Sequence, residues 1–382
     1  MPVFQSRTNP SSPEFRANRE AMLEQVEQMR SLQQRAVDAS HRRADRFAER
    51  GQLTPRQRVS RLLDPGAPFL ELRTHAGYLV DTDDPDRSIP GASQITGIGM
   101  VARTRCMVVA NDSGINAGAL TRAGGAKVLR AQENRLPLVM LVESAGANLL
   151  EYRVEQWAEG GRFFANMARL SAAGVPVITV LHGSSTAGGA YMPGMSDVVI
   201  GVKGRGQAFL AGPPLLKAAT GEVAEADDLG GIDMHATVSG LIEHVAEDDA
   251  DGLRIAREVV GAMRFGTART AEADNRDWDP PVLDPDEIAG VVPADYRTAY
   301  DVREVIARIV DGSRILDVKP RYGPATVCVE ATVFGRPVGI VANNGPIDND
   351  GAQKATQFVQ RCGQLGTPLV FLQNITGYMV GT

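Results

Sequence analysis

A run of small residues, Ser185-Thr-Ala-Gly-Gly-Ala-Tyr191, follows the apolar segment 175–183 and precedes a short helix-like stretch. Small side chains at the start of a helix leave backbone N–H groups uncovered. Such donors stabilise the negative oxygen that develops when a carbonyl compound is attacked or enolised. A tight turn between a strand and a helix would produce the same run, so the residues alone leave a purely structural role open.

A second exit from an apolar strand lies at Glu143-Ser-Ala-Gly146, after the segment 136–142. The carboxyl ends of neighbouring parallel strands form pockets in α/β folds, so this exit favours a binding site. Glu143 is a candidate acid or base, although a strand-end carboxylate without a catalytic role fits better. Segment 209–222 contains Pro213-Pro214 and predicts a rigid pocket wall that leads into a helix.

Other chemistries are disfavoured. The stretch 96–102, TGIGMVA, matches the glycine pattern GxGxxA of dinucleotide-binding motifs. A strand follows it, however, where that motif requires a helix. The serine-hydrolase pattern GxSxG fails at Ala187, and no His/Asp arrangement at triad spacing is apparent. Cys106, Cys328 and Cys362 form no zinc spacing, so we expect no metal.

Composition excludes further classes. The 382 residues include 40 Lys and Arg against 46 Asp and Glu, and a net charge of −6 disfavours binding to nucleic acid. No apolar run approaches the ~20 residues that cross a bilayer, and the N-terminus lacks an apolar signal segment. Three scattered cysteines suit a reducing compartment. We therefore expect a cytoplasmic protein that binds no membrane.

The elements that must position these residues follow a pattern of short strands alternating with helices, which predicts an α/β fold. The first 14 residues read as a loose tail, and 15–50 as one charged helix with an apolar stripe from Met22 to Ala39. By pattern and composition the chain divides into a tail and helix (1–50), a first α/β domain (51–265), a Pro- and Asp-rich linker (266–300) and a further α/β part (301–382).

The chain also repeats itself. Segment 105–114 resembles 336–345, and 134–146 resembles 365–377, at a nearly constant offset of 231 or 232 residues. Two matching pairs at one offset predict a duplicated α/β domain. The first copy continues to Gly188-Gly189, whose counterparts would lie beyond residue 382, so we expect the second domain to be truncated.

Together the motifs resemble those of the carboxyltransferase (β) subunit of biotin-dependent acyl-CoA carboxylases. The resemblance covers the chain from about residue 15 to 382. The motifs are most similar to those of the geranyl-CoA type, then to those of the methylcrotonyl-CoA type, and they are more distant from the propionyl-CoA type. It implies two crotonase-like ββα-spiral domains, the second truncated here. The motifs that carry it are GQLTPRQRVSRLLDPGAPFLEL, QITGIG, VESAGANL, HGSSTAGGAYMPGMSD, FLAGPPLLKAATGE, DVREVIARIVDGS, VGIVANNGPIDNDGAQKATQFVQ and GTPLVFLQNITGYMVG.

The resemblance implies transfer of CO2 from carboxybiotin to the enolate of an acyl-CoA, with one oxyanion hole for the thioester and one for biotin. Domain 51–265 would be the acyl-CoA side and 301–382 the biotin side. Gly188 and Gly189 would be the catalytic donors, and a Cβ at Gly189 would occupy the space of the thioester oxygen. Implied substrate contacts are Ser144, Ala145, Gly146, Thr186, Ala187, Ala190 and Tyr191, and the implied biotin-side residues are Ile375, Thr376 and Gly377.

The same resemblance implies partners. Biotin would be carried by a biotin carboxylase or biotin carboxyl carrier subunit, acyl-CoA would be the substrate, and the chain would form a homo-oligomer, a dimer or a hexamer built from dimers. Three alternatives stay open: a carboxyltransferase for propionyl-CoA or acetyl-CoA, a crotonase-like hydratase or isomerase that uses Glu143, and an inactive truncated assembly subunit.

Two departures from the family pattern concern the first copy. Ten residues separate Lys127 from Pro137, whereas fourteen separate Lys354 from Pro368, so about one helical turn is missing after Glu133. The family's KGG segment is Asn116-Ala-Gly118 here, which puts any lysine role at that place in doubt.

Overall fold

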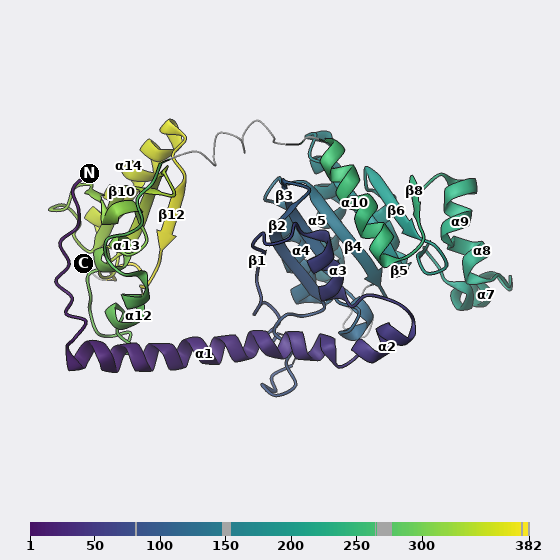
Figure 1. The fold of residues 1–382 in the computed structure, drawn as a ribbon, viewed down its shortest axis with the longest axis horizontal. Helices are drawn as coiled ribbons and strands as arrows, with labels where there is room; N and C mark the ends of the chain where they lie inside the picture. The colour runs from purple at the N-terminus through teal and green to yellow at the C-terminus, as the bar shows by residue number, and fades with distance from the viewer. Residues whose placement is uncertain (81, 147–153, 264, 266–276, 376, 381–382) are drawn as a thin grey trace. The chain divides into compact units, whose positions relative to one another are not determined.

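The computed structural model describes residues 1–80, 82–146, 154–263, 265, 277–375 and 377–380, with the backbone alone for 155–159. They form two compact units (Figure 1). Unit 1 comprises Met1–Met29 and Ala268–Thr382, and unit 2 comprises Arg30–Thr267. Each unit combines helices with a sheet, which confirms the predicted α/β class.

Unit 2 contains a sheet in the order β1-β2-β3-β4-β5-β6-β8, with β7 paired to β5. β2 and β3 form an antiparallel hairpin, and the pairs from β3 to β8 are parallel. The carboxyl ends of β3, β4 and β5 therefore meet at one edge. The bounds are β1 Leu70–Glu71, β2 Gln94–Val101, β3 Thr104–Asn111, β4 Leu138–Ser144, β5 Val177–Thr186, β6 Val198–Val202, β7 Gln207–Phe209 and β8 His244–Ala246.

Helices cover both faces of this sheet. Helices α4 (Arg122–Gln132) and α5 (Val154–Ala172) pack on one face, and α3 (Pro55–Leu62) and α10 (Asp249–Met263) on the other. Strand side chains alternate between the two cores, because successive residues of a strand point to opposite faces. Along β4, Leu138, Met140 and Val142 join the first core, while Val139 and Leu141 join the second.

Shorter helices follow the strand ends of unit 2. The helix predicted after Pro213-Pro214 is α7 (Pro213–Thr220), which begins with both prolines in its first turn, where a missing N–H costs nothing. Its role as a pocket wall stays a prediction. The other short helices are α2 (Ala44–Glu49), η1 (Asn116–Gly118), η3 (Ala187–Ala190), α6 (Tyr191–Gly194), α8 (Ala226–Gly230), α9 (Ile232–Met234) and η4 (His235–Ser239).

The stretch TGIGMVA (96–102) lies in β2 up to Val101. The sequence pattern did not predict this strand. A Cβ at Gly97 would lie 2.3 Å from the Phe69 ring, and one at Gly99 would lie 2.3 Å from Leu63. The glycines therefore make room for these side chains on the sheet. Close packing therefore accounts for the two glycines of this motif, without a role in phosphate binding.

Two expectations for the N-terminal region are wrong. The helix predicted over 15–50 is broken: α1 spans Pro13–His41, and Arg43 leaves the helical conformation so that Phe47 of α2 reaches the interior of unit 2. The tail is also not loose. The Ser6 Oγ and the Arg7 backbone N–H both donate to the Glu304 carboxylate at 2.7 Å, because a buried carboxylate requires donors.

Unit 1 has a four-stranded sheet in the order β12-β11-β10-β9. The described part of the expected linker packs here: a Cβ at Gly290 would lie 2.3 Å from the Phe15 ring. The elements are η5 Pro285–Glu287, α12 Ile288–Val291, α13 Arg303–Ala307, η6 Asp311–Ser313, β9 Leu316–Asp317, β10 Thr326–Val333, β11 Arg336–Asn343, α14 Asn349–Leu365 and β12 Leu369–Leu372.

The two units share one topology over the repeated segments. In unit 2 the order is β2-β3-α4-β4, and in unit 1 it is β10-β11-α14-β12; the first pair is antiparallel and the last pair parallel in both. Asn111 and Asn343 end the equivalent strands. Helix α4 has 11 residues and α14 has 17, so the first copy has the shorter helix, as the residue spacing predicts.

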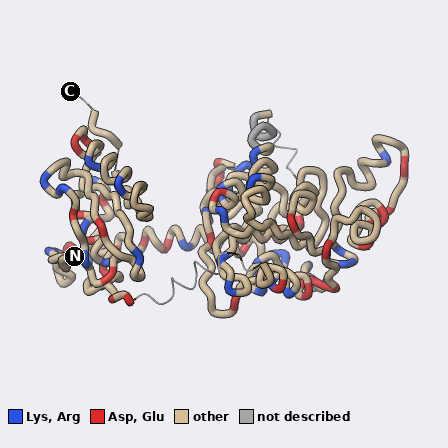
Figure 2. Tube along the Cα trace, turned by 90° about the horizontal axis from the view of Figure 1, so that it is seen from above, with Lys and Arg blue, Asp and Glu red and all other residues tan. Residues whose placement is uncertain are grey.

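Among the described residues, no helix is both long and apolar enough to cross a bilayer. Acidic and basic residues are interspersed along both units (Figure 2).

Candidate functional site

The ends of β4 and β5 lie side by side in unit 2. The two strands are parallel, and Ser144 is the pairing partner of Ser185. A cavity of about 420 Å³ opens at these ends, as expected for the carboxyl edge of a parallel sheet. Its lining residues are Arg43, Arg46, Phe47, Arg50, Gln52, Ser113, Ala117, Glu143, Ser144, Ala145, Ser184 and Thr186.

The loop after β3 is fastened to the end of β4. The Ala145 N–H donates to the Ala117 carbonyl at 3.1 Å, and the Ser144 Oγ donates to the Gly118 carbonyl at 2.9 Å. Asn116, Ala117 and Gly118 all have left-handed backbone angles, with φ of 47°, 51° and 68°. Two non-glycine residues in this conformation are strained, and such strain clusters at functional sites.

The turn after β5 has two glycines in different surroundings. A Cβ at Gly189 would lie 2.9 Å from the Ser185 Oγ, so this residue faces the protein interior. A Cβ at Gly188 would meet no atom within 4 Å. Gly188 therefore faces open space, whereas a Cβ at Gly189 would point toward Ser185. Where the thioester oxygen lies at this turn stays a prediction.

The structure brings part of the predicted substrate set to the cavity. Ser144, Ala145 and Thr186 line it. Gly146 lies beside them, because its N–H donates to the Ser144 Oγ at 3.1 Å and its Cβ position is 2.9 Å from the Thr186 carbonyl. The strand ends thus form a continuous wall.

The other predicted residues lie outside this lining. Ala187, Gly188, Gly189 and Ala190 form η3, which continues the wall beyond Thr186, and the Tyr191 ring packs on Phe164 with centroids 5.0 Å apart. On the predicted biotin side, the Ile347 N–H donates to the Gly377 carbonyl in unit 1, and Ile375 is partly buried nearby in sequence. Thr376 lies outside the described residues.

A buried network supports the floor of the cavity. The Arg58 guanidinium, 1% exposed, pairs with Glu143 at 2.5 Å and with Asp249 at 3.1 Å. The Ser113 Oγ donates to the same Glu143 oxygen at 2.8 Å. Glu143 is thus engaged by two donors of the protein itself, whereas a general acid or base must reach the substrate.

Sequence reasoning missed a contact between His182 and Asp249, whose side chains meet at 2.8 Å. Burial lowers the pKa of His182, so its Nδ1–H donates to the carboxylate as a neutral ring. Burial alone would raise the pKa of Asp249, but the His182 hydrogen bond and the Arg58 charge hold it at about 2. The buried His182 Nε2 has no hydrogen-bond partner among the described residues, so the pair activates no serine there.

Sequence reasoning also missed the basic residues at the mouth of the cavity. Arg43, Arg46 and Arg50 come from α2 and its two ends, and they are exposed. Their spacing of three and four residues was the available signal, because it places them on one side of a helical turn. This rim can bind an anion.

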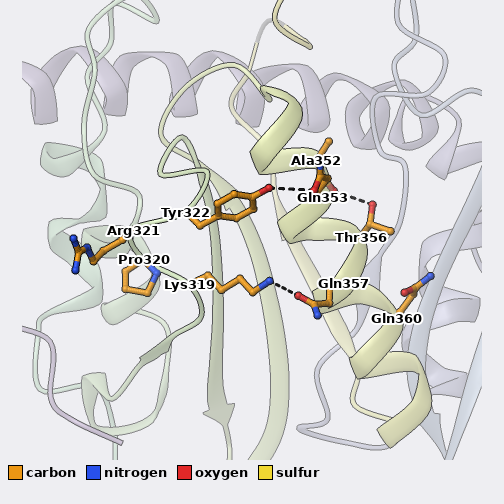
Figure 3. Close-up of a pocket in the computed structure, with 9 residues that line it drawn as sticks. All are labelled: Lys319, Pro320, Arg321, Tyr322, Ala352, Gln353, Thr356, Gln357 and Gln360. Carbon is orange, nitrogen blue, oxygen red and sulfur yellow. Dashed lines mark hydrogen bonds between the residues drawn. The ribbon is translucent and has the colours of Figure 1, made fainter.

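A larger cavity, of about 920 Å³, lies in unit 1 on the outer face of α14 (Figure 3). Its side chains bind one another: the Tyr322 Oη donates to Gln353 at 3.1 Å, and the Lys319 Nζ donates to Gln357. It has no pair of strand ends and no glycine-rich turn, so we do not assign the chemistry to it. The described residues contain no group of three or more potential metal ligands.

Comparisons with known proteins identify relatives. The carboxyl transferase domain model matches residues 46–382. A probable biotin-dependent acyl-coenzyme A carboxylase beta2 subunit of Mycobacterium tuberculosis is 47% identical over 342 residues, which are 88% of this chain and 63% of the relative. The 3-methylcrotonyl-coenzyme A carboxylase beta1 subunit of that organism is 46% identical over 353 residues, 91% of this chain and 65% of the relative.

Solved structures agree. The beta subunit of geranyl-CoA carboxylase of P. aeruginosa matches with a TM-score of 0.90 and 48% identity, covering 100% of this chain and 72% of that one. Transcarboxylase 12S, described as a hexamer assembly, matches with a TM-score of 0.58 and 30% identity, covering 94% and 72%. The chain thus spans less than two thirds of the length of the two mycobacterial relatives.

Proposed function

The chain belongs to the carboxyl transferase domain family, and from this premise we propose that it is the carboxyltransferase component of a biotin-dependent acyl-CoA carboxylase. The resemblance to β subunits inferred from the motifs is confirmed by the relatives. The observation that carries the proposal is the pair of parallel strand ends at Ser144 and Ser185 beside a cavity with an arginine rim. The second of these strands, β5, leads directly into η3.

We place the acyl-CoA thioester against η3 in unit 2. The first N–H groups of a helix have no partner within it, so the start of η3 offers donors to a ligand oxygen. Following the motif resemblance, we assign this role to Gly188 and Gly189. The open space in front of Gly188 admits that oxygen. Ser144, Ala145 and Thr186 then form the wall along which the acyl chain and the pantetheine arm lie.

The chain's contribution to catalysis is electrostatic. Loss of a proton from the acyl chain turns the thioester into an enolate, whose oxygen gains negative charge. Preorganised N–H donors stabilise that charge, and removing one such donor typically costs about 2.7–4 kcal/mol of the barrier. Biotin, when bound, would supply both the carboxyl group and, after release of CO2, the base that takes the proton from the acyl chain. No side-chain nucleophile is required, which agrees with the engagement of Glu143 by Arg58 and Ser113.

For the substrate we propose a branched, unsaturated acyl-CoA, either 3-methylcrotonyl-CoA or geranyl-CoA. The relatives named for these two substrates support it, at 46% and 48% identity. Methylmalonyl-CoA carboxyltransferase 12S of Propionibacterium freudenreichii is 32% identical, so short saturated acyl groups are the second choice.

Further features of the system are part of the same proposal. Both units would have the crotonase-like ββα arrangement, with Ile375, Thr376 and Gly377 on the biotin side. The biotin would be carried by a biotin carboxylase or biotin carboxyl carrier subunit, and the chain would assemble as a homo-oligomer in the cytoplasm. The shared topology of the two units supports the common arrangement, the relatives named as biotin-dependent support the biotin carrier, and the hexamer assembly of transcarboxylase 12S supports the homo-oligomer.

A hydratase or isomerase that uses Glu143 is less favoured. Such an enzyme needs a carboxyl group that exchanges a proton with the substrate. Here one Glu143 oxygen accepts from both Arg58 and Ser113, so donors of the protein itself already engage this carboxyl group. An inactive assembly role would not explain why an arginine rim surrounds the cavity.

The test is carboxyl transfer by the protein as its gene encodes it, with a charged biotin carrier and a panel of acyl-CoA thioesters. We expect acid-stable product from 3-methylcrotonyl-CoA or geranyl-CoA at a higher kcat/KM than from propionyl-CoA or acetyl-CoA. Absence of product from all four thioesters with an active carrier would refute the proposal.

A variant at Gly188 tests the donor role. Gly188→Val adds a branched side chain whose Cβ would meet no protein atom within 4 Å. We expect at least about a hundredfold loss of kcat with an unchanged melting temperature, because the oxygen can no longer reach the donors. Gly194→Val is the matched control, since Gly194 is an exposed glycine whose Cβ position, like that of Gly188, has nothing within 4 Å. Equal activity of both variants would argue against this turn.

A further inference from the structure

The first residues of the chain, purple in Figure 1, lie along unit 1 as an added strand. Residues 2–4 pair with residues 313–315 in the antiparallel sense. The Phe4 N–H donates to the Ser313 carbonyl at 2.9 Å, and the Ile315 N–H donates to the carbonyl two residues before Phe4, at 3.2 Å. Adding an extended segment to a free backbone edge is a common way for proteins to bind peptides.

The side chains of segment 2–8 alternate between the protein and solvent. Every second residue from Phe4 to Thr8 is partly buried, and the residues between them are exposed, which is the pattern of a strand with one face on a surface. Phe4 packs against the core of unit 1. The Ser6 Oγ and the next backbone N–H both donate to the Glu304 carboxylate at 2.7 Å. The contacts therefore define a ligand: an extended backbone with an aromatic ring and, two residues later, a hydroxyl group.

The duplication provides a comparison for this groove. Asp311 follows α13, and its carboxylate accepts from two N–H groups in the turn between β10 and β11. Asp64 follows α3 and accepts in the same way from the turn between β2 and β3. Residues 312–314 therefore correspond to residues 65–67. In unit 2 the latter line an open cavity of about 350 Å³ together with α3, so the duplicated fold forms this hollow without a segment in it.

We infer that residues 313–315, Glu304 and the adjoining core of unit 1 form a binding groove for an extended peptide, and that segment 2–8 of this chain is its ligand. Backbone pairing supplies affinity, and the contacts of Phe4 and Ser6 supply specificity. Because the segment is covalently attached, its effective concentration at the groove is high and the groove of the intact chain is filled. A chain without the segment offers the groove to a free peptide of the same sequence.

The experiment compares the full chain with a variant that lacks residues 2–9. Fluorescence anisotropy measures the binding of a labelled peptide with the sequence of residues 1–10, MPVFQSRTNP. We expect saturable binding by the truncated variant and at least about tenfold weaker binding by the intact chain. Phe4→Ala in the peptide should weaken binding at least about tenfold, because an apolar contact is lost. Gln5→Ala is the matched control, since the Gln5 side chain is exposed and its amide donates within the segment.

A second measurement uses the intact chain. Hydrogen exchange with mass spectrometry follows the Ile315 amide, which donates to the Pro2 carbonyl. Phe4→Ala should speed its exchange at least about tenfold, and Gln5→Ala should leave it unchanged. Unchanged exchange in Phe4→Ala would contradict the role of the ring.

The remaining outcomes decide whether the segment is a ligand. A folded truncated variant that does not bind the peptide would overturn the inference. A truncated variant that does not fold would overturn it too, because the segment would then be an integral part of unit 1. Equal affinity for the Phe4→Ala and Gln5→Ala peptides would show that the groove does not recognise this sequence.

Discussion

Gly118 is the residue that lets the loop after β3 lie against β4. Its φ of 68° is in the left-handed region, and a Cβ there would lie 2.3 Å from the Glu143 carbonyl oxygen. We predict that Gly118→Ala lowers the free energy of unfolding by at least about 1–2 kcal/mol, the cost of the left-handed conformation alone. The measurement is urea denaturation followed by circular dichroism.

Gly161→Ala is the control for this substitution. Gly161 is an exposed glycine inside α5 with nothing within 4 Å of its Cβ position. An alanine there should stabilise the protein by about 0.5–1 kcal/mol, because glycine is unfavourable in a helix. If both alanine variants stabilised the protein, the close approach at Gly118 would be wrong.

His182 makes stability depend on pH. Burial lowers the pKa of His182 below its ordinary value of 6.5, so the unfolded chain binds a proton that the folded chain does not. Stability therefore falls as the pH drops below 6.5, by about 1.4 kcal/mol per pH unit, until the lowered pKa is reached. Asp249 acts in the same direction at lower pH: its stabilisation is present above 3.8 and is lost as the pH falls toward 2.

The check compares wild type with His182→Asn in urea titrations between pH 7.5 and 5.5. Asparagine can still donate to Asp249 but does not titrate, so the variant should have a flatter pH dependence. Parallel curves for the two proteins would show that His182 is not the group responsible.

For single residues, short-range sequence patterns predicted cavity residues, but contacts between residues far apart in the sequence could not be predicted. Ser144, Ala145 and Thr186 could be predicted as cavity residues because each follows an apolar strand, and parallel strands end at one edge. Arg58 and Asp249 are 191 positions apart, and no local pattern predicts that they meet. The arginines of α2 were missed because the helix there was read as continuous.

The equivalent helices α4 and α14 begin with similar caps. The Thr121 Oγ1 accepts from the Gly124 N–H at 3.2 Å, and the Asp348 Oδ1 accepts from the Gly351 N–H at 2.7 Å. We predict that Thr121→Ala and Asp348→Ala each cost about 1 kcal/mol, with the larger loss at Asp348, whose charge also interacts with the helix dipole. Denaturant titrations of the two variants measure this.

Thr356→Ala is the internal control for the caps. Thr356 is exposed in the middle of α14, where its hydroxyl donates to the Ala352 carbonyl of the same helix. Alanine is the better helix former, so this substitution should leave stability unchanged or raise it by a few tenths of a kcal/mol. A loss as large as that of Asp348→Ala would contradict the capping role.

Among the elements, the regular strands and helices of the repeat could be predicted, and the exceptions have identifiable causes. β2 escaped notice because Gly97 and Gly99 replace the usual strand residues to make room for Phe69 and Leu63. The N-terminal segment looked like a tail because its residues are polar. It is held instead by Glu304, which lies 298 positions from Ser6.

Each unit has a core of its own. Met167 is fully buried in unit 2, and Ile306 is fully buried in unit 1. We predict that Met167→Ala and Ile306→Ala each cost about 2–5 kcal/mol within their own unit. Hydrogen exchange with mass spectrometry should show lost amide protection in the mutated unit, and an equal loss in both units for either variant would contradict separate cores.

For the whole molecule, the duplication was visible in the sequence as a constant offset, because both copies retain the strand pair that ends in Asn111 or Asn343. Family membership followed from motifs spread along the chain. The boundaries of the two units could not be predicted from the sequence. Unit 1 takes residues from both ends of the chain, and only contacts in space reveal that arrangement.

The most direct measurement is a crystal structure of the protein with 3-methylcrotonyl-CoA. We predict that the thioester oxygen lies about 3 Å from the backbone nitrogen of Gly188 or Gly189, with the acyl group beside Ser144. An acyl-CoA bound in the α14 cavity of unit 1 (Figure 3), or in unit 2 with its thioester oxygen away from η3, would contradict the proposed site.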